Sequence, residues 1–326
     1  MNPHRPGQRR MALPPEKRAW IERQKAIAEG TGSFTPLGPD HSAFYFEGGP
    51  RLLVTFEFLD TLIDHREADA PLGQALVEGT GCSHLCILAH ALRWYRDPAI
   101  HAHFDALTDR GFFDEFDLVV CYGAGMGGYG AAAYSVAAPG ATVIAVNPQA
   151  TLDPRLTEWD PRFISARRLS FTDRYGYAPE MLDASERAFV LYDPEEELDA
   201  MHASLFHRSH VLRFRCRHLG RNIEDHLLEM GLLKPLVQKA LAGELTAGEL
   251  YRLYRARRSY TPYLRRLMAR LEDDDRMQLA ARLCRYVRAQ FGEERFGKSV
   301  RRIEGRVQEQ LQHRCALQRS MERPLG

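Results

Sequence analysis

The hydrophobic residues of this chain follow two patterns, and the pattern changes near residue 236. Before that point, short apolar runs alternate with segments of helical periodicity, which is typical of a mostly parallel sheet covered by helices. The strand-like runs are SHLCILAH at 83–90, DLVVCYG at 117–123, ATVIAVN at 141–147, RAFVLYD at 187–193 and HVLRFRC at 210–216. We therefore predict an α/β fold, with a mostly parallel sheet flanked by helices in a three-layer sandwich.

The first 60 residues contain further elements. Residues 14–29 predict a helix that begins at prolines and ends at Gly30. A loop rich in Gly and Pro continues to about residue 41. The segment SAFYFEGGPRLLVTFEF at 42–58 then indicates two strands around a Gly-Gly-Pro turn, so we expect a hairpin at the start of the sheet.

From residue 236 onward the apolar positions have helical spacing, and no run reads as a strand. The predicted organisation is therefore an N-terminal helix and loop at 1–40, an α/β domain at 41–235 and a helical appendage at 236–326. The appendage is basic: from Tyr251 to the end there are about 19 Lys plus Arg against about nine Asp plus Glu. We interpret this excess as arginines that pair with carboxylates; a patch for phosphate, nucleic acid or a membrane surface is the alternative. Nucleic-acid binding is not expected, because no signature of a nucleic-acid module accompanies the charge.

Composition sets the protein class. The chain has 326 residues, 44% hydrophobic and 27% charged, with a net charge of +1, as in ordinary globular proteins. Its six cysteines lie mainly in apolar runs, without a second Cys or His pair at zinc-ribbon spacing, so we expect reduced thiols and no metal. The first 20 residues lack the apolar stretch of a secretory signal, and no segment has the length and apolarity of a membrane span. We therefore expect a cytoplasmic protein; the composition does not indicate its oligomeric state.

Chemistry concentrates in one segment, Asp117 to Val146, which predicts a strand, a glycine turn, a helix of small residues and a second strand. Gly123, Gly125 and Gly128 satisfy G-x-G-x-x-G between a strand and a helix, which is the context of a phosphate turn for FAD or NAD. The acidic residue that should follow the next strand is absent, because Asn147 stands there. A dinucleotide-binding oxidoreductase therefore remains an alternative.

The same turn also fits the nucleophile elbow G-x-S-x-G, in which glycines stand two residues before and two after the nucleophile. Gly123 and Gly127 occupy these places, and the nucleophile position is Gly125. The stretch YGAGMGGYGA at 122–131 resembles the elbow Y-G-x-S-M-G-G-Y-x-A of α/β-hydrolase-fold esterases and acyltransferases, with the serine missing. The resemblance implies a ligand site formed by Gly123, Ala124, Gly125, Met126, Gly127 and Tyr129.

The resemblance covers roughly residues 42–235. The triad order of that fold is nucleophile, acid, histidine. It implies that Asp193, just after a strand, is the acid and that His218, after the last strand, is the histidine. It also implies that Gln149, in NPQATLDP, points toward the pocket mouth, and that Gly220 and Arg221 match the Gly-His pair found in related sequences.

The chain is also similar to a group of alphaproteobacterial proteins that carry the name phosphoadenosine phosphosulfate reductase. The similar segments are WYRDPAI, YGAGMGGYGAAAYSVAAPGATV, DRYGYAPEM and RHLG. That reductase has an S-G-G-x-D-S phosphate loop and a C-terminal E-C-G-x-H motif, and neither occurs here. The name therefore gives no functional prediction.

A glycine cannot attack a carbonyl group, although the amide of Met126 can still donate into an oxyanion hole. We therefore predict a nucleophile-less protein that needs no cofactor and binds an acyl-, carboxylate- or phosphate-bearing small molecule or a protein partner. An active hydrolase or acyltransferase is the alternative. It would use water activated by Asp193 and His218, or a substitute nucleophile such as Cys121, Ser83 or Ser135.

Overall fold

The computed structural model describes residues 13–66, 68–292 and 295–321. The chain divides into two compact units, with the break between Leu253 and Tyr254. Of the first 20 residues, in which we expect no secretory signal, residues 1–12 lie outside the described residues.

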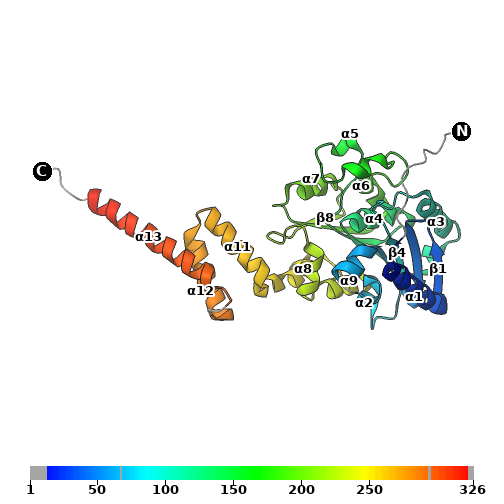
Figure 1. The fold of residues 1–326 in the computed structure, drawn as a ribbon, viewed down its shortest axis with the longest axis horizontal. Helices are drawn as coiled ribbons and strands as arrows, with labels where there is room; N and C mark the ends of the chain where they lie inside the picture. The colour runs from blue at the N-terminus through cyan, green and yellow to red at the C-terminus, as the bar shows by residue number, and fades with distance from the viewer. Residues whose placement is uncertain (1–12, 67, 293–294, 322–326) are drawn as a thin grey trace. The chain divides into compact units, whose positions relative to one another are not determined.

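An eight-stranded sheet forms the centre of the first unit. Its strands are β1 Gly32–Pro36, β2 His41–Phe46, β3 Gly49–Phe58, β4 Cys82–Ala89, β5 Leu118–Ala124, β6 Thr142–Val146, β7 Arg187–Tyr192 and β8 Val211–Arg215. They lie in the order β1-β2-β4-β3-β5-β6-β7-β8 (Figure 1). Strands β3 to β8 pair in parallel, whereas β2 is antiparallel to both β1 and β4. The predicted mostly parallel sheet is confirmed.

The predicted hairpin is wrong. Strand β2 pairs with β4, and β4 separates it from β3. The reason is visible in β3 itself, where residues 52–57 are buried without alternation. A strand that is apolar on both faces belongs in the middle of a parallel sheet, so β3 pairs with β4 and β5, and the antiparallel pair at the sheet edge is β1 with β2.

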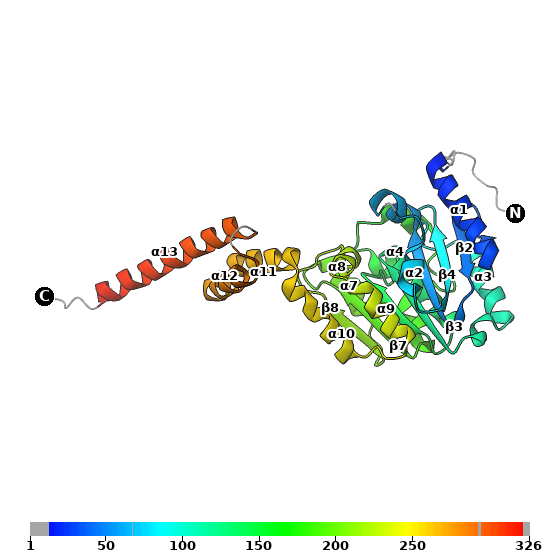
Figure 2. The ribbon, with the colours of Figure 1, turned by 90° about the horizontal axis from the view of Figure 1, so that it is seen from below.

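Helices cover both faces of the sheet, which confirms the three-layer α/β architecture (Figures 1 and 2). One face carries α1 Pro15–Thr31, α2 Leu72–Val77, α8 Ile223–Glu229 and α9 Leu233–Leu241. The other carries α3 Pro98–Asp109, α4 Met126–Tyr134, α6 Ala178–Met181 and α7 Glu197–Leu205. Because side chains alternate along a strand, β3 sends Leu52, Val54 and Phe56 toward the core under α3 and α4, and Thr55 and Glu57 toward α2.

Shorter elements complete the first unit. They are the π-helix η1 Thr61–His65, the helices α5 Pro154–Thr157 and α10 Ala247–Leu253, and the 3₁₀ turns η2 Phe112–Glu115, η3 Ser135–Ala137, η4 Ile164–Arg168 and η5 Leu182–Ala184. Helix α5 and turn η4 lie in the long connection between β6 and β7, which passes over the carboxyl end of the sheet.

The end of the first unit lies later in the chain than residue 235, where we expected the sheet domain to end. Helix α9 buries Leu233, Leu236 and Val237 and packs against α2, β3 and β5. The helical pattern that begins near residue 236 therefore belongs first to α9, which covers the sheet of the first unit.

The second unit is helical, as predicted for the end of the chain. It contains η6 Tyr254–Ser259, α11 Thr261–Asp273, α12 Met277–Phe291 and α13 Gly297–Met321. Its own core includes Leu264, Met268 and Ile303. Some of its arginines pair with carboxylates inside the unit: Arg302 donates to Glu272 at 2.7 Å. Among the described residues, no helix combines the length and apolarity that crossing a bilayer would require.

Candidate functional site

A sharp turn joins β5 to α4 at the carboxyl edge of the sheet. Its central residue, Gly125, has φ 55° and ψ −119°. Two hydrogen bonds hold it, because its N–H donates to the carbonyl of Val146 at 2.8 Å and its carbonyl accepts from the Tyr129 N–H at 3.1 Å. Residues with a side chain rarely adopt this backbone region. The nucleophile of an elbow does so, because the strained turn lifts its side chain off the sheet.

The flanking glycines are required by the packing of this turn. A Cβ atom on Gly123 would lie 2.1 Å from the carbonyl oxygen of Gly127. One on Gly127 would lie 2.2 Å from the carbonyl oxygen of Phe56. At Gly125 itself a Cβ atom would have no neighbour within 4 Å. The turn therefore has the sterics of G-x-S-x-G, with open space at the position where the serine would stand.

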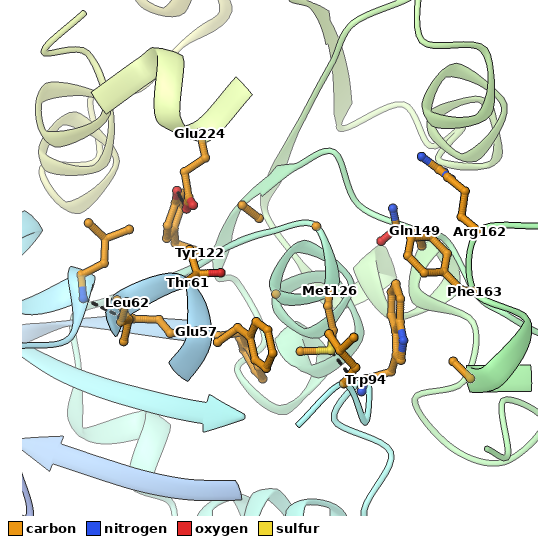
Figure 3. A pocket seen from close by; sticks show the side chains of 18 of the residues that line it. Glu57, Thr61, Leu62, Trp94, Tyr122, Met126, Gln149, Arg162, Phe163 and Glu224 are labelled. Atoms are coloured by element: carbon orange, nitrogen blue, oxygen red, sulfur yellow. Dashed lines mark hydrogen bonds between the residues drawn. The ribbon is translucent and has the colours of Figure 1, made fainter. Parts of the chain in front are cut away.

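This open space belongs to a cavity of about 440 Å³ (Figure 3). The cavity is of the size of small-molecule sites, and its lining combines apolar walls with a few polar groups, as such sites do. The main apolar residues are Phe56, Phe58, Leu62, Trp94, Met126 and Phe163. The polar residues are Glu57, Thr61, Arg66, Tyr122, Gln149, Arg162, Ser165 and Glu224.

The floor of the cavity is the elbow together with the first turn of α4, formed by Ala124, Gly125, Met126 and Gly127. The first N–H groups of a helix have no partner within the helix and carry partial positive charge. They therefore suit a carbonyl or another acceptor oxygen bound over the turn. The Met126 side chain is held from the side, because the N–H of Trp94 contacts its sulfur at 3.2 Å.

Gln149 follows β6 and is buried, with 4% of its surface exposed. Its Nε2 donates to the carbonyl of Asn147 at 3.3 Å, which fixes the orientation of the amide. Its Oε1 is buried and receives no hydrogen bond from any residue that the structure describes. Figure 3 shows this oxygen directed into the cavity.

The two arginines of the cavity already pair with carboxylates. Arg66 donates to Glu224 and, at 2.8 Å, to Asp225. Glu224 also accepts from the Tyr122 hydroxyl, and burial raises the pKa of that phenol well above its usual value, so that it stays protonated.

Arg162 is neutralised in the same way. It donates to Asp160 at 2.8 Å and to Asp199 at 2.6 Å. Burial raises the pKa of Asp160, but hydrogen bonds from His202 and Arg162 outweigh this and lower it, so this aspartate stays ionised. The cavity therefore offers no unpaired positive side chain among the described residues.

A buried network lies behind the cavity wall on the α2 side. Thr55 Oγ1 donates to Glu57 Oε1 at 2.6 Å and lies 2.8 Å from His84 Nε2. Since the threonine has one hydroxyl proton, His84 must be the donor in the second contact. The amides of Leu72 and Gly73 donate to the same carboxylate at 2.7 and 3.0 Å. Burial raises the pKa of Glu57 and lowers that of His84 to about 3, so His84 stays neutral.

Glu57, His84 and Cys86 are also the one group among the described residues whose chemistry and spacing would suit a metal, with donor atoms within 4.8 Å of one another. The spacing of these residues in the sequence does not predict this group. Thr55 and the two α2 amides already satisfy the Glu57 oxygens. Burial also raises the pKa of the Cys86 thiol well above its usual value, which opposes formation of a thiolate ligand.

The structure places the expected acid and histidine away from the cavity lining. Asp193 follows β7 and is 1% exposed. Its Oδ1 accepts from the Glu195 N–H at 3.0 Å, and its Oδ2 accepts from the Gly220 N–H at 2.7 Å. His218 follows β8 with φ 65°, and its Nδ1 lies 3.0 Å from Glu195 Oε2.

The predicted ligand residues divide into two groups. Ala124, Gly125, Met126, Gly127 and Gln149 line the cavity. Gly123, Tyr129 and Arg221 do not: Gly123 closes the turn, the buried Tyr129 hydroxyl donates to the carbonyl of Tyr175 at 2.7 Å, and Arg221 pairs with Glu196 at 2.8 Å.

The three substitute nucleophiles are also not among the residues that line the cavity. Cys121 is buried in β5, and burial raises its pKa to about 12. Ser83 contacts the backbone of Gly48 and Gly49 at the start of β4, and Ser135 donates to the carbonyl of Ala132 at 2.9 Å. None of the described residues that line the cavity is a cysteine or a histidine.

A dinucleotide-binding domain of the Rossmann type would require a different strand order from the one observed. A Rossmann domain has the strand order 3-2-1-4-5-6, with the glycine turn after its first strand. In this sheet the turn follows β5, between β3 and β6, and Asn147 follows the next strand. Gly128 packs tightly against β6, since a Cβ atom there would lie 2.9 Å from the carbonyl oxygen of Val146.

Several residues that line the cavity were not predicted from the sequence. Glu57 had a signal, because it is an acidic residue inside the apolar run LLVTFEF. Arg66, Tyr122, Arg162 and Glu224 had none, since their segments meet only through the fold.

The strand order, with β2 antiparallel, and the strained turn between β5 and α4 define the class: this chain has the α/β-hydrolase fold. No protein-family model matches the chain, and no curated protein matches its sequence.

Among solved structures, three similar ones have related folds at low identity. A Pyrobaculum calidifontis esterase is 13% identical over 70% of this chain and 91% of its own, with a TM-score of 0.41. The carboxylesterase EstE1 from a metagenomic library is 12% identical over 74% of this chain and 94% of its own, with a TM-score of 0.38. The capsule O-acetyltransferase of Neisseria meningitidis serogroup A is 12% identical over 62% of this chain and 93% of its own, with a TM-score of 0.37. Similarities of this size carry no argument about activity.

Proposed function

We propose that this protein is a nucleophile-less member of the α/β-hydrolase fold that binds a small carbonyl-bearing molecule in the cavity over Gly125 without cleaving it. The single observation that carries the proposal is the state of Gly125. It has the backbone of an elbow nucleophile and open space above it, but no side chain.

The surroundings of the turn support binding in preference to catalysis. In a serine hydrolase a histidine must take the proton of the nucleophile. No histidine is among the described residues of the cavity lining, and Glu224 instead extends from α8 into the cavity. Glu224 is held by Arg66 and Tyr122 and is therefore not free to take a proton from a water molecule that attacks a bound ester.

In this proposal Asp193 and His218 are remnants of a triad with structural roles. Asp193 fixes the loop after β8, because it accepts from the N–H of Gly220. His218 and Glu195 hold the same loop against the end of β7.

The test is chemical labelling. The purified protein is incubated with a fluorophosphonate, and its intact mass is measured alongside its rate of p-nitrophenyl acetate hydrolysis. We expect an unchanged mass and a hydrolysis rate equal to that of buffer. The matched control is Ser165→Ala, because Ser165 is the serine that lines the cavity. Stoichiometric labelling that Ser165→Ala abolishes would overturn the proposal by identifying a nucleophile on the cavity wall. Labelling that survives in this variant would also overturn it, by locating the nucleophile elsewhere.

A further inference from the structure

Two features of the cavity call for hydrogen bonds of opposite kinds. Gln149 Oε1 is an acceptor in a side chain with only 4% of its surface exposed, and it receives no bond from the described residues. A buried acceptor without a donor costs about 1–3 kcal/mol. A ligand with an N–H or O–H group directed at this oxygen removes that cost.

The floor offers the complementary groups. The amides of Met126 and Gly127 belong to the first turn of α4, a helix whose N-cap residue, Gly125, has no side chain that could cap them. Amides at this position favour an acceptor oxygen. A ligand that satisfies both features therefore carries an acceptor and a donor close together.

The charged side chains of the cavity argue against an anionic ligand. Arg66 is shared between Glu224 and Asp225, and Arg162 is shared between Asp160 and Asp199. A carboxylate or phosphate entering the cavity would meet the four carboxylates around these two arginines and the oxygen of Gln149. Arg66 Nε is buried without a hydrogen-bond partner among the described residues, but the charge of Arg66 is already balanced by Glu224 and Asp225. Burying an unpaired charge is far more costly than burying a neutral amide with both hydrogen bonds made.

The walls of the cavity suit a ligand with a flat apolar substituent next to its hydrogen-bonding group. The Trp94 and Phe163 rings pack edge to face with centroids 4.8 Å apart, and Phe56, near the carboxyl end of β3, also lines the cavity. An aromatic ligand ring gains from such neighbours both apolar contact and ring–ring interaction.

We propose, on the basis of the function proposed above, that the cavity selects a neutral carboxamide with an apolar or aromatic substituent. The amide carbonyl accepts from the N-terminal amides of α4, and the amide N–H donates to Gln149 Oε1. The protein therefore discriminates an amide from the corresponding ester, and both from a carboxylate.

The experiment compares three probes of similar size by ligand-observed NMR titration of the full chain: acetanilide, phenyl acetate and the phenylacetate ion. Acetanilide and phenyl acetate differ by the exchange of N–H for O. We expect acetanilide to bind about tenfold more tightly than phenyl acetate, because the ester leaves Gln149 Oε1 without a donor. The phenylacetate ion is expected to bind most weakly.

Gln149→Met removes the acceptor at nearly constant shape, and Gln149→Leu provides a second variant should the first fold poorly. Either variant should bind acetanilide about tenfold more weakly and lose the preference for amide over ester. The control is Gln238→Met on α9, where the glutamine also donates to a backbone carbonyl, that of Leu76, but lies outside the cavity lining. This control should keep the preference.

The outcomes separate the two proposals. Equal affinities of wild type for amide and ester, tighter binding of the anion, or a preference that survives both Gln149 variants would overturn the carboxamide inference while leaving a binding cavity intact. Absence of binding by all three probes would overturn the proposed function as well.

Discussion

Substitution of Gly125 by serine restores the missing side chain and measures how closely this turn matches a nucleophile elbow. Two terms decide its cost. The backbone at φ 55° and ψ −119° disfavours a side chain, and holding a non-glycine residue in such a region costs about 1–3 kcal/mol. The packing term is close to zero, because a Cβ atom there has no neighbour within 4 Å. We therefore expect Gly125→Ser to lower the free energy of unfolding of the first unit by about 1–3 kcal/mol.

The stability loss of Gly125→Ser is compared with that of a second variant, Gly127→Ser. There a Cβ atom would lie 2.2 Å from the carbonyl oxygen of Phe56, in β3, and the clash is with backbone that cannot rotate away. We expect a loss of more than about 4 kcal/mol, in the range reserved for severe core defects. Gly140→Ser is the control for backbone strain alone, because Gly140 has φ 81° and open space but lies away from the cavity.

Urea unfolding followed by circular dichroism measures all three variants, with the transition of the first unit analysed separately from that of the helical unit. The expected order of stability loss places Gly125→Ser near Gly140→Ser and far below Gly127→Ser. Equal losses for Gly125→Ser and Gly127→Ser would refute the steric reasoning and with it the elbow.

Three further predictions concern the ionisable groups. Burial lowers the pKa of His84 to about 3 from 6.5; its neutral form therefore stabilises the fold above pH 6.5 and this contribution is lost as the pH falls. The advantage of wild type over His84→Gln in unfolding free energy should shrink by roughly 1 kcal/mol per pH unit between pH 6 and 5, and a constant difference would contradict the assignment. Glu224→Gln removes the carboxylate partner of the largely buried Arg66, so urea unfolding at pH 7 should show a loss of about 1–3 kcal/mol, and no loss would argue against the ion pair. In the helical unit, hydrogen bonds with arginines lower the pKa of Glu272; the thermal transition of Glu272→Gln should therefore fall below that of wild type at pH 7 and approach it at pH 3, whereas a gap that persists at pH 3 would assign the effect to packing.

The local features of the site were predictable from sequence because they depend on residues close together in the chain. The sequence pattern of the elbow needs only Gly123, Gly125 and Gly127, and a Cβ atom on Gly123 would meet the carbonyl oxygen of Gly127, four residues along the chain. Gln149 follows the next strand and could be placed by the same resemblance.

What failed depends on contacts between distant segments. Strand β2 pairs with β4 and not with β3, which brings together residues about 45 positions apart. The Gly-Gly-Pro turn between β2 and β3 led us to predict a hairpin, although β3 is apolar on both faces. The ion pair between Arg66 and Glu224 links residues 158 positions apart, and no local sequence pattern predicts it. The pairing of both cavity arginines with carboxylates, from which we infer a neutral ligand, therefore became visible only in the structure.

The most direct test of a cavity that binds without cleaving uses phenyl acetate and a stoichiometric amount of protein in one proton NMR time course. Ser165→Trp serves as the control, because Ser165 is an exposed residue of the lining and its replacement by tryptophan obstructs the cavity. We predict that wild type broadens the phenyl acetate signals, that Ser165→Trp does not, and that in both samples the ester disappears at the rate of buffer alone. Release of phenol and acetate by wild type above that rate, abolished in Ser165→Trp, would contradict the account.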